Sequence, residues 1–370
     1  TRQFKGTLSI DVHDDSGRLS PWLPDEALGV GGSQLQAIYE VGGGTQVNMG
    51  WFRITENTPD DLWKLYRIED LGHNELDSDV PPDMREISVS QGSTIAVDAE
   101  ELTVNIKRDR FIAPESPRGS SPTVLGELAR ITADIVPLNV PETITDKAIS
   151  KSVIYERERL DAVEDLISRL SAGWRMNGNG ELELYPLSDR TSRWRIAGGE
   201  GGALVRVSRK QSLDGLDNIF VSDGTKKATN SKGEQVDLPV RGIAMVKHGP
   251  LGADGPHGRS TVFRSSPLIT SEAIAIADAQ TFRDNTLARQ TIDLTVTCLP
   301  NPALETGDYV TVAQPVLSGE RVTLDGRIKT MELSGGAGTV DAMVLTVTCD
   351  ADLVQRIMRS ALRGQFAETD

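Results

Sequence analysis

The histidines are the side chains of this chain best suited to metal binding or to proton transfer near neutral pH. There are four, His13, His73, His248 and His257. None sits at a metal-binding spacing such as His-x-x-x-His, and three fall in segments that we expect to be loops. His248 and His257 could meet in one loop, but no cysteine or paired carboxylate supports a site there. Surface or hydrogen-bonded roles are therefore favoured over metal ligation.

A cluster of carboxylates near the N-terminus, Asp11, Asp14 and Asp15, resembles a calcium-binding loop at first sight. Its spacing departs from the pattern Asp-x-[Asp/Asn]-x-[Asp/Asn]-Gly followed later by Glu. Asp14 and Asp15 are followed by Ser16 and Gly17, a composition that is typical of a turn. The sequence therefore predicts a turn rather than a calcium site.

Nucleophile and phosphate-binding motifs are missing from the sequence. The glycine-rich segments 29–32 and 198–202 lack the Lys-Ser/Thr of a phosphate-binding loop, and no Gly-x-Ser-x-Gly string occurs. Glu181 and Glu183 are expected on the exposed face of one short hairpin rather than as a glycosidase pair. The basic run 206–210 is expected on a solvated strand edge. We therefore predict no catalytic, cofactor-binding or metal-binding residues, and no enzymatic activity.

Only two cysteines are present, Cys298 and Cys349. Each ends the same string, Leu-Thr-Val-Thr-Cys, at 294–298 and at 345–349. Two thiols do not make a disulfide scaffold in a chain this long, so two small buried strand residues are predicted. We expect no signal peptide and no membrane span, because no apolar run approaches roughly 20 residues.

Length, charge and composition place the chain among folded proteins of two or three domains. It has 370 residues, 38% of them hydrophobic, with a formal net charge of −15. The acidic surplus opposes non-specific binding to nucleic acid, because phosphates are repelled. Frequent glycine and proline, 35 and 18 residues, favour many short strands and turns over long helices.

The elements that would carry these side chains begin with an all-β segment. Alternation predicts strands at 4–12, 34–41, 47–56, 85–90 and 94–98, and a strand or irregular crossing at 62–71. The loop at 21–32 is expected to be anchored by Trp22, Leu23, Leu28 and Val30. Residues 99–107 are expected to form a short helix or strand that leads away from this domain.

The middle of the chain changes to an α+β pattern after the Pro- and Ser-rich linker at 114–122. Thr123 is a plausible N-cap for a helix, and 159–171 carries apolar residues at helical spacing. A strand is expected at 136–140. A hairpin is expected at 174–185, with its turn at Asn177-Gly-Asn-Gly180.

From about residue 205 the β pattern returns, with candidate strands at 205–211, 218–222, 243–246, 291–298, 309–313, 321–333 and 339–349. The polar stretch 223–237 is expected to be a long hairpin tip. A helix capped by Ser271 is predicted at 271–288, and a helix or tail at 351–370.

Four strings, in order, resemble the hub and tail-associated proteins of long-tailed phages. They are Ser9 to Pro24 followed by Met49-Gly-Trp-Phe-Arg-Ile54; residues 95–111; residues 159–185 with Gly180-Glu-Leu-Glu-Leu-Tyr-Pro186; and the Ala-rich helix followed by Asn301-Pro-Ala-Leu-Glu-Thr-Gly-Asp-Tyr-Val310. The last string is the most characteristic. Pro302 and Gly307 would set turns, Asp308 would cap the loop, and a strand would follow.

This resemblance implies a mainly β fold with α+β insertions: two similar β-barrel domains plus small α/β units, as in phage baseplate hubs. The expected domains are a first barrel at 1–112, an α+β insertion at 113–195, a second barrel at 196–350 and a tail at 351–370. The implied role is a hub of the tail tip in the virion that lets DNA pass. The implied partners are two further copies in a homotrimer, the distal tail, tail tube and tape measure proteins, and downstream tip or fibre proteins.

Two other interpretations stay open from the sequence. A receptor- or carbohydrate-binding tail module could use the tryptophans at 22, 51, 63, 174 and 194 as stacking faces, although aromatics are more often core residues. A cell-wall hydrolase is the third reading, and the lack of a nucleophile–base or metal constellation argues against it.

Overall fold

The computed structural model describes residues 6–41, 44–67, 86–209, 216–229, 235–249, 251–266, 269–288, 290–315, 321–336, 339–340, 342–351, 353–354 and 357–358. The chain forms two compact units. The first comprises Thr1–Thr191 and Asn301–Asp308, and the second comprises Ser192–Pro300 and Tyr309–Asp370. The domain boundaries expected after residues 112, 195 and 350 stay predictions.

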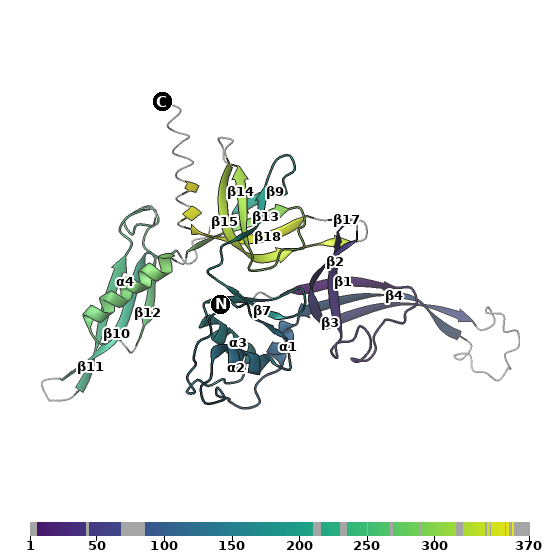
Figure 1. Ribbon diagram of the computed structural model, residues 1–370, viewed down its shortest axis with the longest axis horizontal. Coiled ribbons are helices and arrows are strands. Elements are labelled where there is room, and N and C mark those ends of the chain that lie inside the picture. The colour runs from purple at the N-terminus through teal and green to yellow at the C-terminus, as the bar shows by residue number, and fades with distance from the viewer. Residues whose placement is uncertain are drawn as a thin grey trace, which may run out of the picture. The chain divides into compact units, whose positions relative to one another are not determined.

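Strands dominate both units, which confirms the mainly β prediction (Figure 1). The first unit contains β1 (Thr7–Asp14), β2 (Gln34–Val41), β3 (Thr45–Arg67), β4 (Glu86–Glu101), α1 (Thr103–Arg108), α2 (Val124–Thr132), β5 (Leu138–Asn139), α3 (Arg159–Ser168), β6 (Ala172–Met176) and β7 (Leu182–Pro186). The second contains β8 (Ser192–Ala197), β9 (Leu204–Arg209), β10 (Ile219–Thr229), β11 (Gln235–Met245), β12 (Thr261–Ser265), α4 (Glu272–Ala288), β13 (Thr291–Cys298), β14 (Tyr309–Pro315), β15 (Arg321–Glu332), β16 (Gly335–Gly336), β17 (Thr339–Val340) and β18 (Met343–Asp350).

A four-stranded antiparallel sheet, in the order β1-β4-β3-β2, opens the first unit. Its core is small and contains Ile54, Ile95 and Val97, with Leu28 packed against them. β3 and β4 are longer than predicted. Hydrogen bonding between them carries β4 through Gln91 and Gly92, where the sequence suggested a break, and a register shift between Asp61 and Trp63 accommodates the extra residues.

The loop at 21–32 corrects one prediction. Of its four expected anchors only Leu28 packs on the core, while Trp22, Leu23 and Val30 are 79%, 59% and 39% exposed. An apolar residue in a loop does not show from sequence whether a neighbouring surface exists to bury it.

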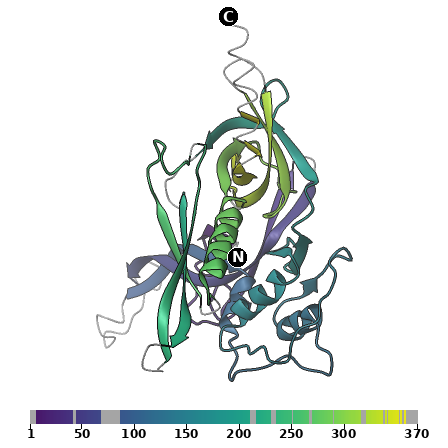
Figure 2. The ribbon, with the colours of Figure 1, turned by 90° about the vertical axis from the view of Figure 1, so that its left-hand side faces the viewer.

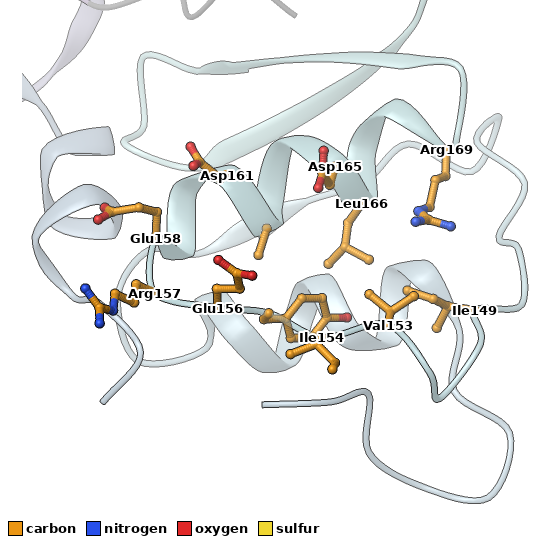
Figure 3. Close-up of a pocket in the computed structure, with 12 residues that line it drawn as sticks. Ile149, Val153, Ile154, Glu156, Arg157, Glu158, Asp161, Asp165, Leu166 and Arg169 are labelled. Carbon is orange, nitrogen blue, oxygen red and sulfur yellow. The ribbon is translucent and has the colours of Figure 1, made fainter. Parts of the chain in front are cut away.

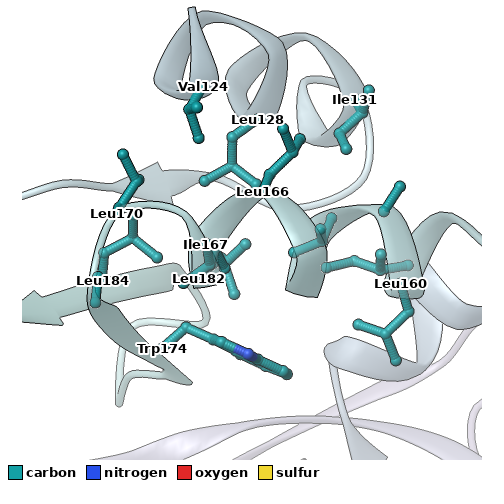
Figure 4. Close-up of a cluster of buried hydrophobic side chains, with 14 of the residues drawn as sticks. Val124, Leu128, Ile131, Leu160, Leu166, Ile167, Leu170, Trp174, Leu182 and Leu184 are labelled. Atoms are coloured by element: carbon teal, nitrogen blue, oxygen red, sulfur yellow. The ribbon is translucent and has the colours of Figure 1, made fainter. Parts of the chain in front are cut away.

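The α+β part of the first unit has an extensive buried cluster. Leu128 and Ile131 of α2 meet Leu166 and Ile167 of α3, and Trp174 of β6 closes the other side (Figure 4). The apolar residues whose spacing predicted both helices therefore form the faces on which the helices pack. The predicted cap also holds, because Gly126 N donates to Thr123 Oγ1 at 3.2 Å. The three strands of this part are ordered β5-β7-β6.

The second unit contains a six-stranded sheet, β8-β14-β15-β18-β13-β9, which curves strongly (Figure 2). It buries Leu294, Val296, Ile328, Leu345 and Val347 almost completely. β9 is an edge strand, as the basic run at 206–210 predicted for its described residues. The sheet's curvature is that of a partial barrel, and the expectation of two similar β-barrel domains remains a prediction.

A second sheet of this unit, β11-β10-β12, is covered on one face by α4 (Figure 2). Phe220 and Ala244 of the sheet pack against Ala279 and Phe282 of the helix, and Ser271 Oγ accepts from Ile274 N at the helix start. The polar stretch 223–237 is not one long hairpin tip, since β10 extends to Thr229 and β11 starts at Gln235. Polar residues complete a backbone ladder as well as apolar ones do.

Within the described part of the chain, no helix has the length and apolarity that a membrane crossing requires. The helix or tail predicted at 351–370 lies mostly outside the described residues.

Candidate functional site

A cluster of charged side chains gathers around Arg175 of β6, within the first unit. Its Nε lies 2.6 Å from Oε2 of Glu183, Nη2 lies 2.7 Å from Oε2 of Glu305, and Nη1 lies 2.8 Å from Oδ1 of Asp308. Nη1 also donates to the backbone oxygen of Thr306 at 3.2 Å. The guanidinium thus uses its fork of donors on three carboxylates and one carbonyl. We call these four charged residues the Arg175 cluster.

The local sequence explains how the cluster is built. Asn177 Oδ1 accepts from the backbone N–H groups of Asn179 and Glu181, at 3.0 Å each, which closes the predicted hairpin turn between β6 and β7. The turn then donates Gly178 N to Oε1 of Glu305 at 3.1 Å. On the other side, Glu305 N donates to Oδ2 of Asp308 at 3.0 Å, as the capping role predicted for Asp308 requires.

The ring of Tyr185 fills the space behind the cluster. A Cβ atom placed on Gly173 would lie 2.4 Å from the ring, and one on Gly307 would lie 2.5 Å from it. Gly307 also has a φ of +91°, a conformation that side chains other than glycine adopt only with strain. The guanidinium carbon of Arg175 lies 5.6 Å from the ring centroid. Segment 301–308 is therefore held on the β6–β7 hairpin by charge and by close packing.

Electrostatics favour a fixed, fully charged arginine. Burial opposes its charge, but Glu305, Asp308 and Glu183 together raise the pKa of Arg175 above its ordinary value. Burial raises the pKa of Glu305, and the arginine only partly offsets this. Because three carboxylates already occupy the guanidinium, the cluster has no donor fork left for an anionic substrate. Its chemistry is that of a structural clamp.

The cluster corrects the prediction for the Glu181–Glu183 pair. Glu183 is not a solvated hairpin residue, because it pairs with Arg175. Glu181 accepts from Asn177 Nδ2 at 2.8 Å and from Asn139 Nδ2 at 3.3 Å. Arg175 itself was not singled out from the sequence, since two of its partners lie more than a hundred residues away. Its partners Glu183, Glu305 and Asp308 belong to the strings 180–186 and 301–310, which the sequence marks only as a family resemblance.

The predicted turn at Asp14 is confirmed. Its carboxylate accepts from Ser16 N at 2.9 Å, Ser16 Oγ at 2.6 Å and Leu19 N at 2.6 Å. These hydrogen bonds, that of Leu19 first, lower the pKa of Asp14. Its oxygens are therefore committed to the backbone rather than to a cation.

The three histidines that the structure describes have different surroundings. His13 of β1 contacts Thr94 Oγ1 at 3.2 Å, and His257 Nε2 lies 2.8 Å from the carbonyl oxygen of Leu216. His248 is exposed, and His73 lies outside the described residues. Among the residues that the structure describes, no three His, Cys, Asp or Glu side chains come close enough to hold a metal ion.

A cleft of about 440 Å³ lies between α3 and segment 149–158 (Figure 3). Its apolar wall includes Val153 and Leu166, and Asp161 and Asp165 project from α3 at its edge. Glu158 is paired with Arg110 at 3.1 Å. Burial raises the pKa of Tyr155, the lining phenol, to about 12, so it stays neutral. The lining thus offers carboxylates without a nucleophile prepared to react.

The two cysteines are free and buried, as predicted. Burial raises the pKa of the Cys298 thiol to about 11 and that of Cys349 to about 12. Both thiols are therefore protonated at neutral pH and poor nucleophiles.

The tryptophans divide into buried and exposed ones. Trp174 is 3% exposed and belongs to the core, whereas Trp22 and Trp63 are 79% and 56% exposed. Trp51 and Trp194 are half-buried. Trp22 borders a second cavity, of about 330 Å³, whose lining also includes Thr55, Glu56 and Asn57.

Comparison with known proteins gives likenesses among solved structures only, since no family model and no curated protein sequence matches the chain. A tail protein from Neisseria meningitidis is 10% identical and has a TM-score of 0.49, with 92% of this chain and 91% of that chain covered. A prophage MuSo2 43 kDa tail protein from Shewanella oneidensis is 11% identical with a TM-score of 0.45, covering 86% and 98%. Prophage tail protein gp18 from Listeria monocytogenes is 11% identical with a TM-score of 0.42, covering 89% and 88%. The function proposed for this chain therefore has to be argued from its own residues.

Proposed function

We propose that the chain is a structural subunit of a phage tail tip, a hub that assembles as a homotrimer in the virion. Each of the three copies would contribute two β-rich parts, and the six parts would form a ring of pseudo-sixfold geometry. The tail tube and distal tail proteins would match this geometry on one side of the ring. The tape measure protein and the downstream tip or fibre proteins are its other expected neighbours. Symmetric closure of this kind requires complementary surfaces rather than a catalytic pocket.

One observation carries this proposal: large apolar side chains are exposed at the end of the β3–β4 ribbon. Beyond Asp14, where β1 ends, β3 and β4 pair only with each other in the described structure. Leu62, Trp63 and Leu65 are 60%, 56% and 63% exposed there. A two-stranded ribbon is marginally stable alone, and exposed apolar groups of this size mark contact surfaces. We assign this surface, residues 62–65, to contact with a second copy of the chain.

A second sheet supports the same proposal. On the face of β11-β10-β12 that α4 does not cover, Ile243, Met245 and Phe263 are 49%, 41% and 62% exposed. A solvated sheet face usually carries polar side chains, so exposed apolar residues on the face opposite α4 favour a protein that is covered on assembly.

The charge agrees with the proposed passage of DNA. With a net charge of −15, the chain repels phosphates overall, which disfavours adhesion of DNA to the ring. The Arg175 cluster suits a subunit that is under mechanical stress, because three polar contacts of one side chain, to Glu305, Asp308 and the backbone oxygen of Thr306, fix segment 301–308.

Self-association tests the proposal. Native mass measurement and sedimentation of the full chain over a concentration series should show a trimer. Trp63→Ser with Leu65→Ser should weaken association roughly tenfold or more, because truncated interface anchors each cost over 1 kcal/mol. Ile112→Ser is the matched control, since Ile112 is fully exposed in the same unit but lies outside the ribbon. Equal association of both variants and the wild type would contradict the assigned surface.

A chain that stays monomeric even when mixed with its distal tail partner would contradict the hub itself. A receptor- or carbohydrate-binding module is the second candidate, and the exposure of Trp22 is the observation that favours it.

A further inference from the structure

Trp22 is held in an exposed position by a well-bonded loop. The carboxylate of Glu26 accepts from the backbone N–H groups of Trp22 and Leu23, at 2.5 and 3.2 Å. Gly29 N donates to Glu26 O at 2.8 Å, and Gly31 N donates to Pro24 O at 2.6 Å. These hydrogen bonds fix the loop, so the exposed position of the Trp22 indole is set by the folded loop.

The loop is also tied to the sheet beneath it. Leu28 packs against the core of the four-stranded sheet, and Asn57 Nδ2 of β3 donates to Leu28 O at 2.9 Å. This brings the polar stretch Thr55, Glu56 and Asn57 to one wall of the cavity that Trp22 borders. Pro21, Pro24 and Val30 supply the rest of the lining with Leu23.

We propose that this cavity binds neutral saccharides, with Trp22 as the stacking platform. One face of a pyranose ring presents C–H groups, which pack on an aromatic face, while its hydroxyls need donors and acceptors at the ring edge. Trp22 offers the face, and the edge groups are acceptors for sugar hydroxyls: the Glu56 carboxylate, Thr55 Oγ1 and Asn57 Oδ1. The Thr55 O–H and Asn57 Nδ2 already donate to the backbone oxygens of Asp98 and Leu28. A preformed site with one apolar surface and a few polar groups is the usual form of a small-ligand pocket.

Two other ligands fit less well. A protein anchor would bury Trp22 among apolar neighbours, but one wall of this cavity is polar. Phosphate-bearing or otherwise anionic polymers would be repelled by the Glu56 carboxylate and by the chain's net charge of −15. The inference does not depend on the hub role, since a tail-tip protein and a separate receptor-binding module could both carry such a site.

The test uses the labelled full chain on an array of neutral and acidic oligosaccharides, with free chitotetraose, maltotetraose and cellotetraose as competitors. The expected result is binding to at least one neutral glycan class, reversed by the matching free oligosaccharide. Trp22→Ala should lower this binding about tenfold or more. Glu56→Gln should weaken it while leaving the stacking contribution in place.

Ile112→Ala is the matched control, because Ile112 is also an exposed large apolar residue of the first unit but lies outside both the cavity and the ribbon. It should change glycan binding by no more than about twofold. Unchanged thermal unfolding of the Trp22 variant would show that the loop remains folded. The proposal is overturned if no neutral glycan binds, or if the Trp22 variant binds as well as the wild type. It is also overturned if Trp22→Ala weakens self-association instead, since the surface would then contact protein.

Discussion

Nη1 of Arg175 lies 2.8 Å from Oδ1 of Asp308, although 133 residues separate them along the chain. The contact fastens segment 301–308 to the β6–β7 hairpin of the first unit. Two strings that stood out in the sequence, one on the hairpin and one after the helix at 271–288, are therefore the two halves of one structural clamp.

Replacing Arg175 should be among the most damaging single changes in the first unit. In Arg175→Met the three carboxylates keep their places without a counter-charge, and removal of one partner from a buried ionic cluster costs roughly 3 kcal/mol. Urea denaturation, followed at the transition in which the first unit unfolds, would measure this loss of unfolding free energy. Arg110→Met is the control, because the Arg110–Glu158 pair is largely exposed and is worth less than about 1 kcal/mol. Similar losses in the two variants would contradict the clamp.

The packing of Tyr185 gives a second test. Gly173→Ala places a methyl group against the ring and should cost roughly 1–3 kcal/mol, as overpacking does. In a Tyr185→Ala background the same change should cost much less, because the clashing atoms are gone. A double-mutant cycle read by urea denaturation measures this coupling. Additive effects would show that the ring does not occupy the space between Gly173 and Gly307.

The extent to which the sequence predicts the structure differs from element to element. Alternation of apolar and polar residues predicts most strands. The local chemistry of the side chains predicts the Thr123 cap and the Asn177–Gly180 turn. All of these features depend on neighbours a few residues away. The Arg175 cluster could not be inferred in that way, because a salt bridge between distant segments leaves no local pattern. The same limit explains Trp22: its exposure depends on which surfaces the fold leaves beside the loop.

The length of the β3–β4 ribbon shows a related limit. Gln91 and Gly92 suggested a break between two strands, yet pairing with β3 carries β4 on to Glu86. Strand length is decided by the partner strand as well as by intrinsic preference.

The cysteines should be unreactive in the folded protein. Burial raises the pKa of both thiols, so the thiolate that attacks a reagent is almost absent at pH 8. A thiol-reactive dye should label Cys298 and Cys349 only after denaturation, with both labelled together if the six-stranded sheet unfolds as one. Rapid labelling of the native chain would contradict their burial in β13 and β18.

The Asp14 turn predicts a pH dependence. Its pKa is lowered from the ordinary 3.8 in the folded chain, so its stabilising contribution is complete above that value and is lost as the pH falls through the lower folded value. Asp14→Asn should therefore be less stable than the wild type at pH 7, and the difference should shrink in acid below the ordinary value. Thermal unfolding at both pH values measures this. A difference that stays constant with pH would show that the charge of Asp14 is not involved.

The central claim is that this chain builds the tip of a phage tail. Cryo-electron microscopy of intact tails, with the chain's β sheets fitted to the tip density, tests it most directly. The account predicts three copies in a closed ring around an open channel, with the β3–β4 ribbon of each copy on its neighbour. Tails that lack the chain at the tip, or that carry it as a single peripheral copy, would contradict it.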